Sequence, residues 1–204
     1  MPLIDPDLPR LTKRKLFDVR DDSPHVLLVG SFGDWHTYAF GYKNAADVVV
    51  ERLVKLHRVS EVAVLAVLFL YRHYVELSLK GMLLDAGELL RQDEQAPIGH
   101  PLTPLWMKLR DRLNKIERQN DPEWLDRAET LIREFDSLDY SSYTFRYPVD
   151  KKGAPNSPPS RTVDIDHFRK VMDELEMVLG GIAAWLDNYV GIKREMDAEF
   201  RDSY

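Results

Sequence analysis

Apolar residues recur with a helical period through most of the chain beyond residue 40. In AADVVVERLVKLHR they fall on one face of a helix, and polar residues occupy the other. A second helix is predicted from Ser60, a favourable N-cap residue, to about Leu90. Its first half, EVAVLAVLFL, is apolar on every side, which is typical of a helix buried by its neighbours. The pattern therefore predicts that this helix lies at the centre of a bundle.

Three further helices are predicted from their start signals and apolar spacing. Thr103 is a favourable N-cap before Pro104 at the first helical position, and the two residues open TPLWMKLRDRLNKIER. Asp121 and Pro122 repeat that signature before EWLDRAETLIREFDSLD, so we expect an antiparallel helix pair. Asp164 starts the last helix, DIDHFRKVMDELEMVLGGIAAWLDNYV, and the charged KREMDAEFRDSY after it either frays or extends its end.

Two segments have no helical pattern. Residues 1–38 have mixed character, and VLLVG at 26–30 is their best strand candidate. The segment YSSYTFRYPVDKKGAPNSPPSRTV is rich in Pro, Ser and Gly, and a loop of such length is more often functional or mobile than accidental. The expected class is all-α, an antiparallel bundle of about five helices with a small N-terminal extended or β element. Residues 1–38 would form an arm, 39–192 the bundle and 193–204 a charged tail.

The composition of the chain indicates the cellular compartment and limits the partners expected for such a bundle. The chain has 204 residues, 44% hydrophobic and 30% charged, as expected for one soluble domain. The net charge of −6 gives no overall attraction to nucleic acid or to anionic membranes, although a local basic patch is compatible with it. Cysteine is absent, which excludes disulfides and thiolate chemistry and fits a reducing compartment. The longest apolar run is about half of a membrane span, so we expect a cytoplasmic protein without a membrane partner.

The segment FLYRHYVELSLKGML places charged residues on the helix predicted to be buried. Arg72, Glu76 and Lys80 follow one another at four-residue intervals and therefore lie on one helix face, with His73 within a turn of Glu76. A buried Arg needs carboxylate or carbonyl partners. Two interpretations remain open. The cluster is either a structural charge network between helices or a partly open polar pocket that meets a phosphate or an RNA backbone.

Two loop motifs carry further candidates. His100, in GHPL, lies just before a helix N-terminus, where free backbone N–H groups favour anions. Arg146, between Phe145 and Tyr147, is placed either to pair with Glu76 inside the bundle or to stack on a nucleobase. The structural alternatives are a loop-to-helix cap for His100 and an ion pair that pins the loop for Arg146.

Four segments in order, GYKNAADVVVERL, FLYRHYVELSLKGML, GHPLTPLW and YTFRYPVD before a long helix, resemble the HEPN superfamily. They are most similar to bacterial members with an Arg-His-x-x-Glu-Leu-x-x-Lys helix, a Gly-His-x-Leu-x-x-Leu segment and a Phe-Arg-Tyr-Pro loop, and the resemblance covers roughly residues 40–190. It implies a bundle of four to five helices, usually a homodimer, that acts in prokaryotic toxin–antitoxin and anti-phage systems. Many members are metal-independent ribonucleases, and others are inactive or bind nucleotides. The implied partners are a second copy, an antitoxin or defence protein, and RNA or a nucleotide.

The superfamily's catalytic signature is Arg, four to six residues and then His, at the start of a late helix. Arg161 and His167 have this spacing at that place, although Arg161 falls in the loop before the helix. The chain contains two other pairs with the same spacing, Arg20/His25 and Arg52/His57. The spacing alone therefore does not distinguish a catalytic Arg–His pair from a pair that arises by chance.

The candidate sets follow from both arguments. The catalytic candidates are Arg72, His73, Glu76, Arg161 and His167, and the candidates for RNA or nucleotide binding are Lys80, His100, Arg146 and Tyr147. In a ribonuclease, His73 or His167 would act as the base that assists the ribose 2′-hydroxyl, and an arginine would stabilise the phosphorane. We expect no metal and no cofactor, because His-x-x-Glu occurs once, without the second copy that a di-metal bundle needs. The alternative function is a non-catalytic interaction or nucleotide-binding module whose charged cluster is structural.

Overall fold

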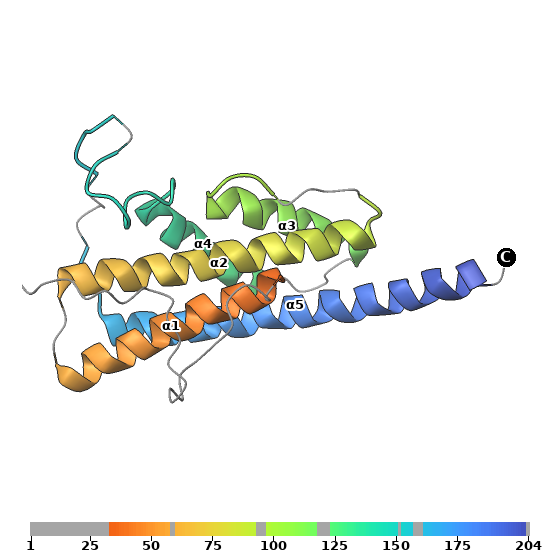
Figure 1. The fold of residues 1–204 in the computed structure, drawn as a ribbon, viewed down its shortest axis with the longest axis horizontal. Helices are drawn as coiled ribbons and strands as arrows, with labels where there is room; N and C mark the ends of the chain where they lie inside the picture. The colour runs from red at the N-terminus through yellow and green to blue at the C-terminus, as the bar shows by residue number, and fades with distance from the viewer. Residues whose placement is uncertain are drawn as a thin grey trace, which may run out of the picture. The chain divides into compact units, whose positions relative to one another are not determined.

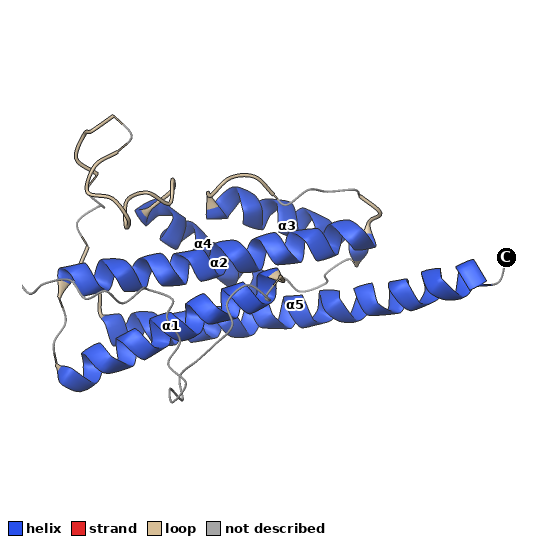
Figure 2. Cartoon of the chain, in the orientation of Figure 1, coloured by secondary structure: helices blue, strands red, loops and turns tan. Residues whose placement is uncertain are grey.

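The computed structural model describes residues 33–57, 60–92, 97–117, 123–150, 152–156 and 161–202, all within one compact unit. It contains five helices and, among these residues, no strand (Figures 1 and 2). The helices are α1 (Trp35–Leu56), α2 (Glu61–Leu89), α3 (Leu102–Ile116), α4 (Glu123–Leu138) and α5 (Ile165–Asp202). The predicted all-α bundle of five helices is confirmed. The strand expected at 26–30 lies outside the described residues.

Helix α2 is the centre of the bundle, as its apolar pattern predicts. It packs against α1, α3 and α5, and in Figure 1 it lies between the α3/α4 pair and the α1/α5 pair. Every residue from Tyr74 to Leu83 is buried. Of the described helices, α2 is also the one long and apolar enough to cross a membrane, but half of its most apolar window is buried inside the bundle. A core helix of a bundle has the same properties.

The helix boundaries follow local capping in three places. Ser60 is the N-cap of α2, as predicted, and its Oγ accepts a hydrogen bond from the Ala63 N–H. Helix α1 starts at Trp35, earlier than the helical pattern expected beyond residue 40 and inside the segment assigned to an arm, because Asp34 accepts the Thr37 N–H at 2.8 Å. Helix α5 continues to Asp202, so the described part of the charged tail extends the helix.

The start of α3 differs from the prediction. Its N-cap position is Pro101, which has no side-chain hydrogen bond to offer, and Thr103 lies within the helix. The carboxylate of Asp136, on α4, accepts the N–H groups of Leu102 and Thr103 at 2.8 and 3.1 Å. A residue from another helix therefore supplies the cap that we expected from Thr103 itself.

Candidate functional site

Arg72 is the fully buried centre of the polar cluster on α2. Its Nη1 donates to Glu76 Oε2 at 3.1 Å, and its Nε donates to the backbone carbonyl of Asp139 at 2.8 Å. Its Nη2 donates to the backbone carbonyl of His100 at 2.8 Å. The guanidinium also lies 3.8 Å from the carboxylate of Asp136. One buried cation therefore joins α2 to the loop before α3 and to the segment after α4.

Glu76 is equally buried, with 2% of its side chain exposed. Its Oε1 accepts hydrogen bonds from Lys80 Nζ at 2.8 Å and from His100 Nδ1 at 2.9 Å. Burial opposes ionisation, but the hydrogen bonds from Lys80 and His100 outweigh it and hold the pKa of Glu76 below its usual value. Glu76 is therefore a carboxylate at neutral pH, shared between Arg72, Lys80 and a histidine that reaches the surface.

Of the two roles left open for Arg146, the ion pair with Glu76 is wrong. Arg146 is exposed, and its Nε donates to the Ser142 carbonyl at 2.6 Å. Its Cζ lies 5.4, 5.2 and 5.6 Å from the ring centres of Phe69, Tyr143 and Tyr147. Glu76 is buried and already shared by three donors, so the guanidinium stays at the surface among aromatic rings.

His73 lies between these rings and the buried cluster. Its ring stacks on Phe69, with centres 5.6 Å apart, and is perpendicular to the Tyr42 ring, with centres 4.4 Å apart. Burial lowers the pKa of His73; the charge of Glu76 opposes this shift, whereas the charges of Lys80 and Arg146 reinforce it. The imidazole is therefore neutral at pH 7, and two neighbouring rings restrict access to it.

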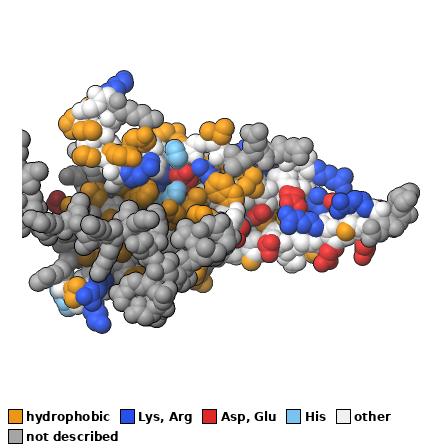
Figure 3. All heavy atoms as spheres, in the orientation of Figure 1, with side chains coloured by type: hydrophobic (Ala, Val, Ile, Leu, Met, Phe, Trp, Pro, Cys, Tyr) orange, Lys and Arg blue, Asp and Glu red, His pale blue; other side chains and the backbone are white. Residues whose placement is uncertain are grey.

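Helix α2 contacts two of the other motifs that carry the resemblance. Arg72 and Glu76 bind His100 of the GHPL loop, and Phe69, one turn earlier on α2, lies against Arg146 of the FRYP loop. Figure 3 shows histidine, basic and acidic side chains gathered on one face, with hydrophobic side chains around them. We call Arg146 and the rings of Phe69, Tyr143 and Tyr147 the arginine–aromatic face.

Arg161 and His167 lie elsewhere in the bundle. Both are exposed and both line a cavity of about 290 Å³ between α4 and the start of α5. Arg161 pairs with Glu134 at 3.3 Å, and the backbone N–H of His167 donates to Asp164. Arg161 and His167 line the same cavity, but neither has a contact with the Glu76 cluster among those described. The structure therefore divides the sequence-based candidates into two groups.

A second buried cation was missed by the sequence analysis. Lys43 is 2% exposed, and its Nζ lies 2.8, 2.7 and 3.0 Å from carboxylate oxygens of Asp47, Asp173 and Glu176. Asp47 also accepts the Tyr71 hydroxyl at 2.7 Å. Burial alone would lower the pKa of Lys43, but these hydrogen bonds raise it above its usual value. The four-residue spacing of Lys43 and Asp47 is the only local signal; Asp173 and Glu176 come from α5.

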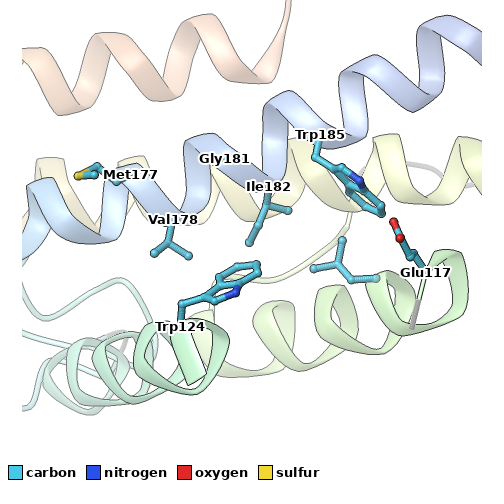
Figure 4. A pocket seen from close by; sticks show the side chains of 8 residues that line it. Glu117, Trp124, Met177, Val178, Gly181, Ile182 and Trp185 are labelled. Carbon is cyan, nitrogen blue, oxygen red and sulfur yellow. The ribbon is translucent and has the colours of Figure 1, made fainter. Parts of the chain in front are cut away.

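An apolar cavity of about 540 Å³ lies between the end of α3, the start of α4 and the middle of α5. In Figure 4, Trp124 faces Val178 and Ile182, with Trp185 and Glu117 at one end. Trp124 is 43% exposed, so this cavity is open to solvent. Glu117 is the one charged residue among the described residues that line it. None of its lining residues belongs to the Glu76 cluster or to the cavity that Arg161 and His167 line.

Within the described residues, no group of three or more His, Asp or Glu side chains is arranged to hold a metal ion. The chain matches none of the protein-family models, curated proteins or solved structures with which it was compared. The HEPN resemblance therefore rests on the four segments alone.

Proposed function

We propose that the protein is a HEPN-like RNA-binding protein that cleaves single-stranded RNA without a metal ion. The observation that carries the proposal is that α2 bears both the arginine–aromatic face, at Phe69, and a histidine that is bonded to a buried carboxylate, at Glu76. Arg146 lies between 5.2 and 5.6 Å from three aromatic ring centres, and His100 donates to Glu76 at 2.9 Å. Rings and guanidinium planes are the groups on which unpaired bases stack.

The chemistry that these groups support is transesterification. The ribose 2′-hydroxyl, assisted by a histidine, attacks the adjacent phosphorus and leaves a 2′,3′-cyclic phosphate. Arg146 is exposed and positively charged, so it can bind a phosphate oxygen and stabilise the charge that develops there. Arg72 has a different role: it is fully buried, so it holds the loops in place and does not touch RNA.

The biological setting is proposed from the resemblance. HEPN-like proteins of this type act as cytoplasmic homodimers in toxin–antitoxin and anti-phage systems, with an antitoxin or another defence protein as partner. The supporting observations are the five-helix bundle and the contacts of the α2 motif with two other motif segments, since Arg72 binds His100 and Arg146 lies over Phe69.

The purified protein incubated with single-stranded RNA and EDTA tests the activity. We expect fragments that end in a 2′,3′-cyclic phosphate, detected by mass spectrometry, and loss of cleavage in Arg146→Ala. The matched control is Arg201→Ala, an exposed arginine at the end of α5 that the site does not include. Cleavage that Arg146→Ala leaves intact but Arg161→Ala or His167→Ala abolishes would move the site to the cavity between α4 and α5.

The second candidate is a non-catalytic interaction module. The burial of Arg72, Glu76 and Lys80, with at most 10% of any side chain exposed, favours it, because such a network stabilises a fold without any ligand. In that case RNA stays intact in the experiment above, and Arg72→Ala lowers the melting temperature without another effect.

A further inference from the structure

The buried carboxylate of Glu76 fixes the chemical state of His100. Arg72 and Lys80 both donate to Glu76, and the pKa of Glu76 is lowered, so its oxygens can only accept hydrogen bonds. Nδ1 of His100 lies 2.9 Å from Glu76 Oε1 and must therefore carry the proton. In the neutral ring this leaves the lone pair on Nε2.

The backbone of His100 is held as firmly as its ring. Its carbonyl accepts Arg72 Nη2 at 2.8 Å. Gly99 before it has φ of +107°, a conformation that side chains rarely adopt, and Pro101 follows it. The same Arg72–Glu76 pair thus binds both the main chain and the ring of one residue.

The free edge of the imidazole faces the surface. The His100 side chain is 54% exposed, whereas that of Glu76 is 2% exposed. Nε2 of His100 makes no hydrogen bond to any residue that the structure describes. A histidine that has one ring nitrogen bonded to a buried carboxylate and the other free to accept a proton has the arrangement of a general base. His73, stacked between Phe69 and Tyr42, lacks such a partner.

We propose that Glu76 positions His100 as the Nδ1-protonated tautomer, and that Nε2 accepts the proton of the ribose 2′-hydroxyl. The inference rests on the proposed ribonuclease function and names a base that differs from both His73 and His167. The 2′-oxygen forms its bond to phosphorus while the bond from phosphorus to the 5′-oxygen breaks. The departing 5′-oxygen takes a proton from water, and the hydroxide that remains recovers the proton from His100. No other reactant is consumed.

His100→Asn separates this role from a structural one. The amide nitrogen of Asn can replace Nδ1 as the donor to Glu76, but no group replaces Nε2. We expect His100→Asn to keep the melting temperature, the RNA dissociation constant and KM of the wild type. Its kcat should fall by about 10²–10⁴-fold, the usual contribution of a general base. His100→Ala should lose the same activity and some stability as well.

Nitrogen-15 NMR of the wild type gives a readout that does not depend on activity. At a pH where the ring is neutral, we expect a protonated Nδ1 and an unprotonated Nε2 in His100. Glu76→Gln should shift the proton toward Nε2, provided that circular dichroism shows this variant to be folded. If it unfolds, the wild-type tautomer and His100→Asn decide the question.

The outcomes distinguish the two proposals. Wild-type cleavage with an inactive, stable His100→Asn variant and an Nδ1-protonated ring supports the inference. Wild-type cleavage that His100→Asn retains, or an Nε2-protonated ring in the wild type, overturns the inference and leaves the ribonuclease proposal standing. RNA left intact by the wild type overturns the ribonuclease function, and the role of His100 as a base with it.

Discussion

Arg72 donates a hydrogen bond of 2.8 Å to the carbonyl oxygen of His100, a residue 28 positions further along the chain. The same guanidinium donates to the carbonyl of Asp139, which lies 67 positions away. Three segments that are distant in sequence thus meet at one fully buried side chain. Loop position at the arginine–aromatic face consequently depends on a cation in the core.

Arg72→Met should destabilise the bundle strongly. The variant leaves the backbone carbonyls of His100 and Asp139 without their Arg72 donor and removes one of the cations that neutralise Glu76. Breaking a buried ion pair by removing one partner costs about 3–5 kcal/mol of unfolding free energy. Urea unfolding followed by circular dichroism measures it. Arg52→Met, at an exposed position of α1, is the matched control and should stay within about 0.5 kcal/mol. Equal stability of the two variants would contradict the central role of Arg72.

Asp136→Ala should cost more stability than Thr103→Ala, although Thr103 has the better local signature of a cap. The Asp136 carboxylate accepts two N–H groups at the start of α3, whereas Thr103 takes part only through its backbone N–H, which Thr103→Ala retains. Loss of a capping side chain costs about 0.5–2 kcal/mol. Thermal unfolding of the two variants side by side tests the order, and a larger loss in Thr103→Ala would show that α3 caps itself.

The contact between His36 and Asp85 should make stability depend on pH. The hydrogen bond that His36 Nε2 donates to the Asp85 carboxylate raises the pKa of His36 above its usual value of 6.5, against the effect of burial. A group whose pKa is raised by folding stabilises the folded state below the unfolded pKa, and this contribution disappears as the pH rises through the folded value. The wild type should therefore exceed Asp85→Asn in stability at pH 5.5 by more than at pH 8.5. His36 is 43% exposed, so the difference should be about 1 kcal/mol or less. Equal differences at both pH values would refute the prediction.

Arg146→Ala should weaken the binding of single-stranded RNA and reduce its salt dependence. Loss of one phosphate contact lowers the slope of log K against log salt by about 0.7 for a single strand. Arg146→Lys keeps the charge but not the flat surface among Phe69, Tyr143 and Tyr147, so it should restore the slope and only part of the affinity. Fluorescence anisotropy with a labelled oligonucleotide at several salt concentrations measures both quantities. An equal loss in Arg201→Ala would indicate nonspecific attraction.

The helices could be predicted because their causes are local. Ser60 and the apolar residues that follow it define the start and the buried surface of α2 within one stretch of sequence. The grouping of Arg72, Glu76 and Lys80 was predictable for the same reason, since a spacing of four residues is a neighbour relation on any helix.

Long-range partners could not be predicted in this way. The cap of α3 comes from Asp136, more than thirty residues away, and no local rule selects it over Thr103. The pairing of Arg146 with Glu76 failed because a sequence does not show how many donors a carboxylate already has. Glu76 is shared by Arg72, Lys80 and His100, and this leaves Arg146 to the aromatic rings.

The ion pairs of the buried Lys43 determine when, during synthesis of the chain, α1 can pack into the bundle. Asp47, four residues away, is at hand as soon as α1 forms, but Asp173 is added to the chain 130 residues after Lys43. Until the ribosome has delivered α5, the ammonium of Lys43 has one carboxylate in place of three and is better solvated by water than by the bundle. Helix α1 can therefore reach its final packing only after α5 has been synthesised, although α1 is the first described helix of the chain.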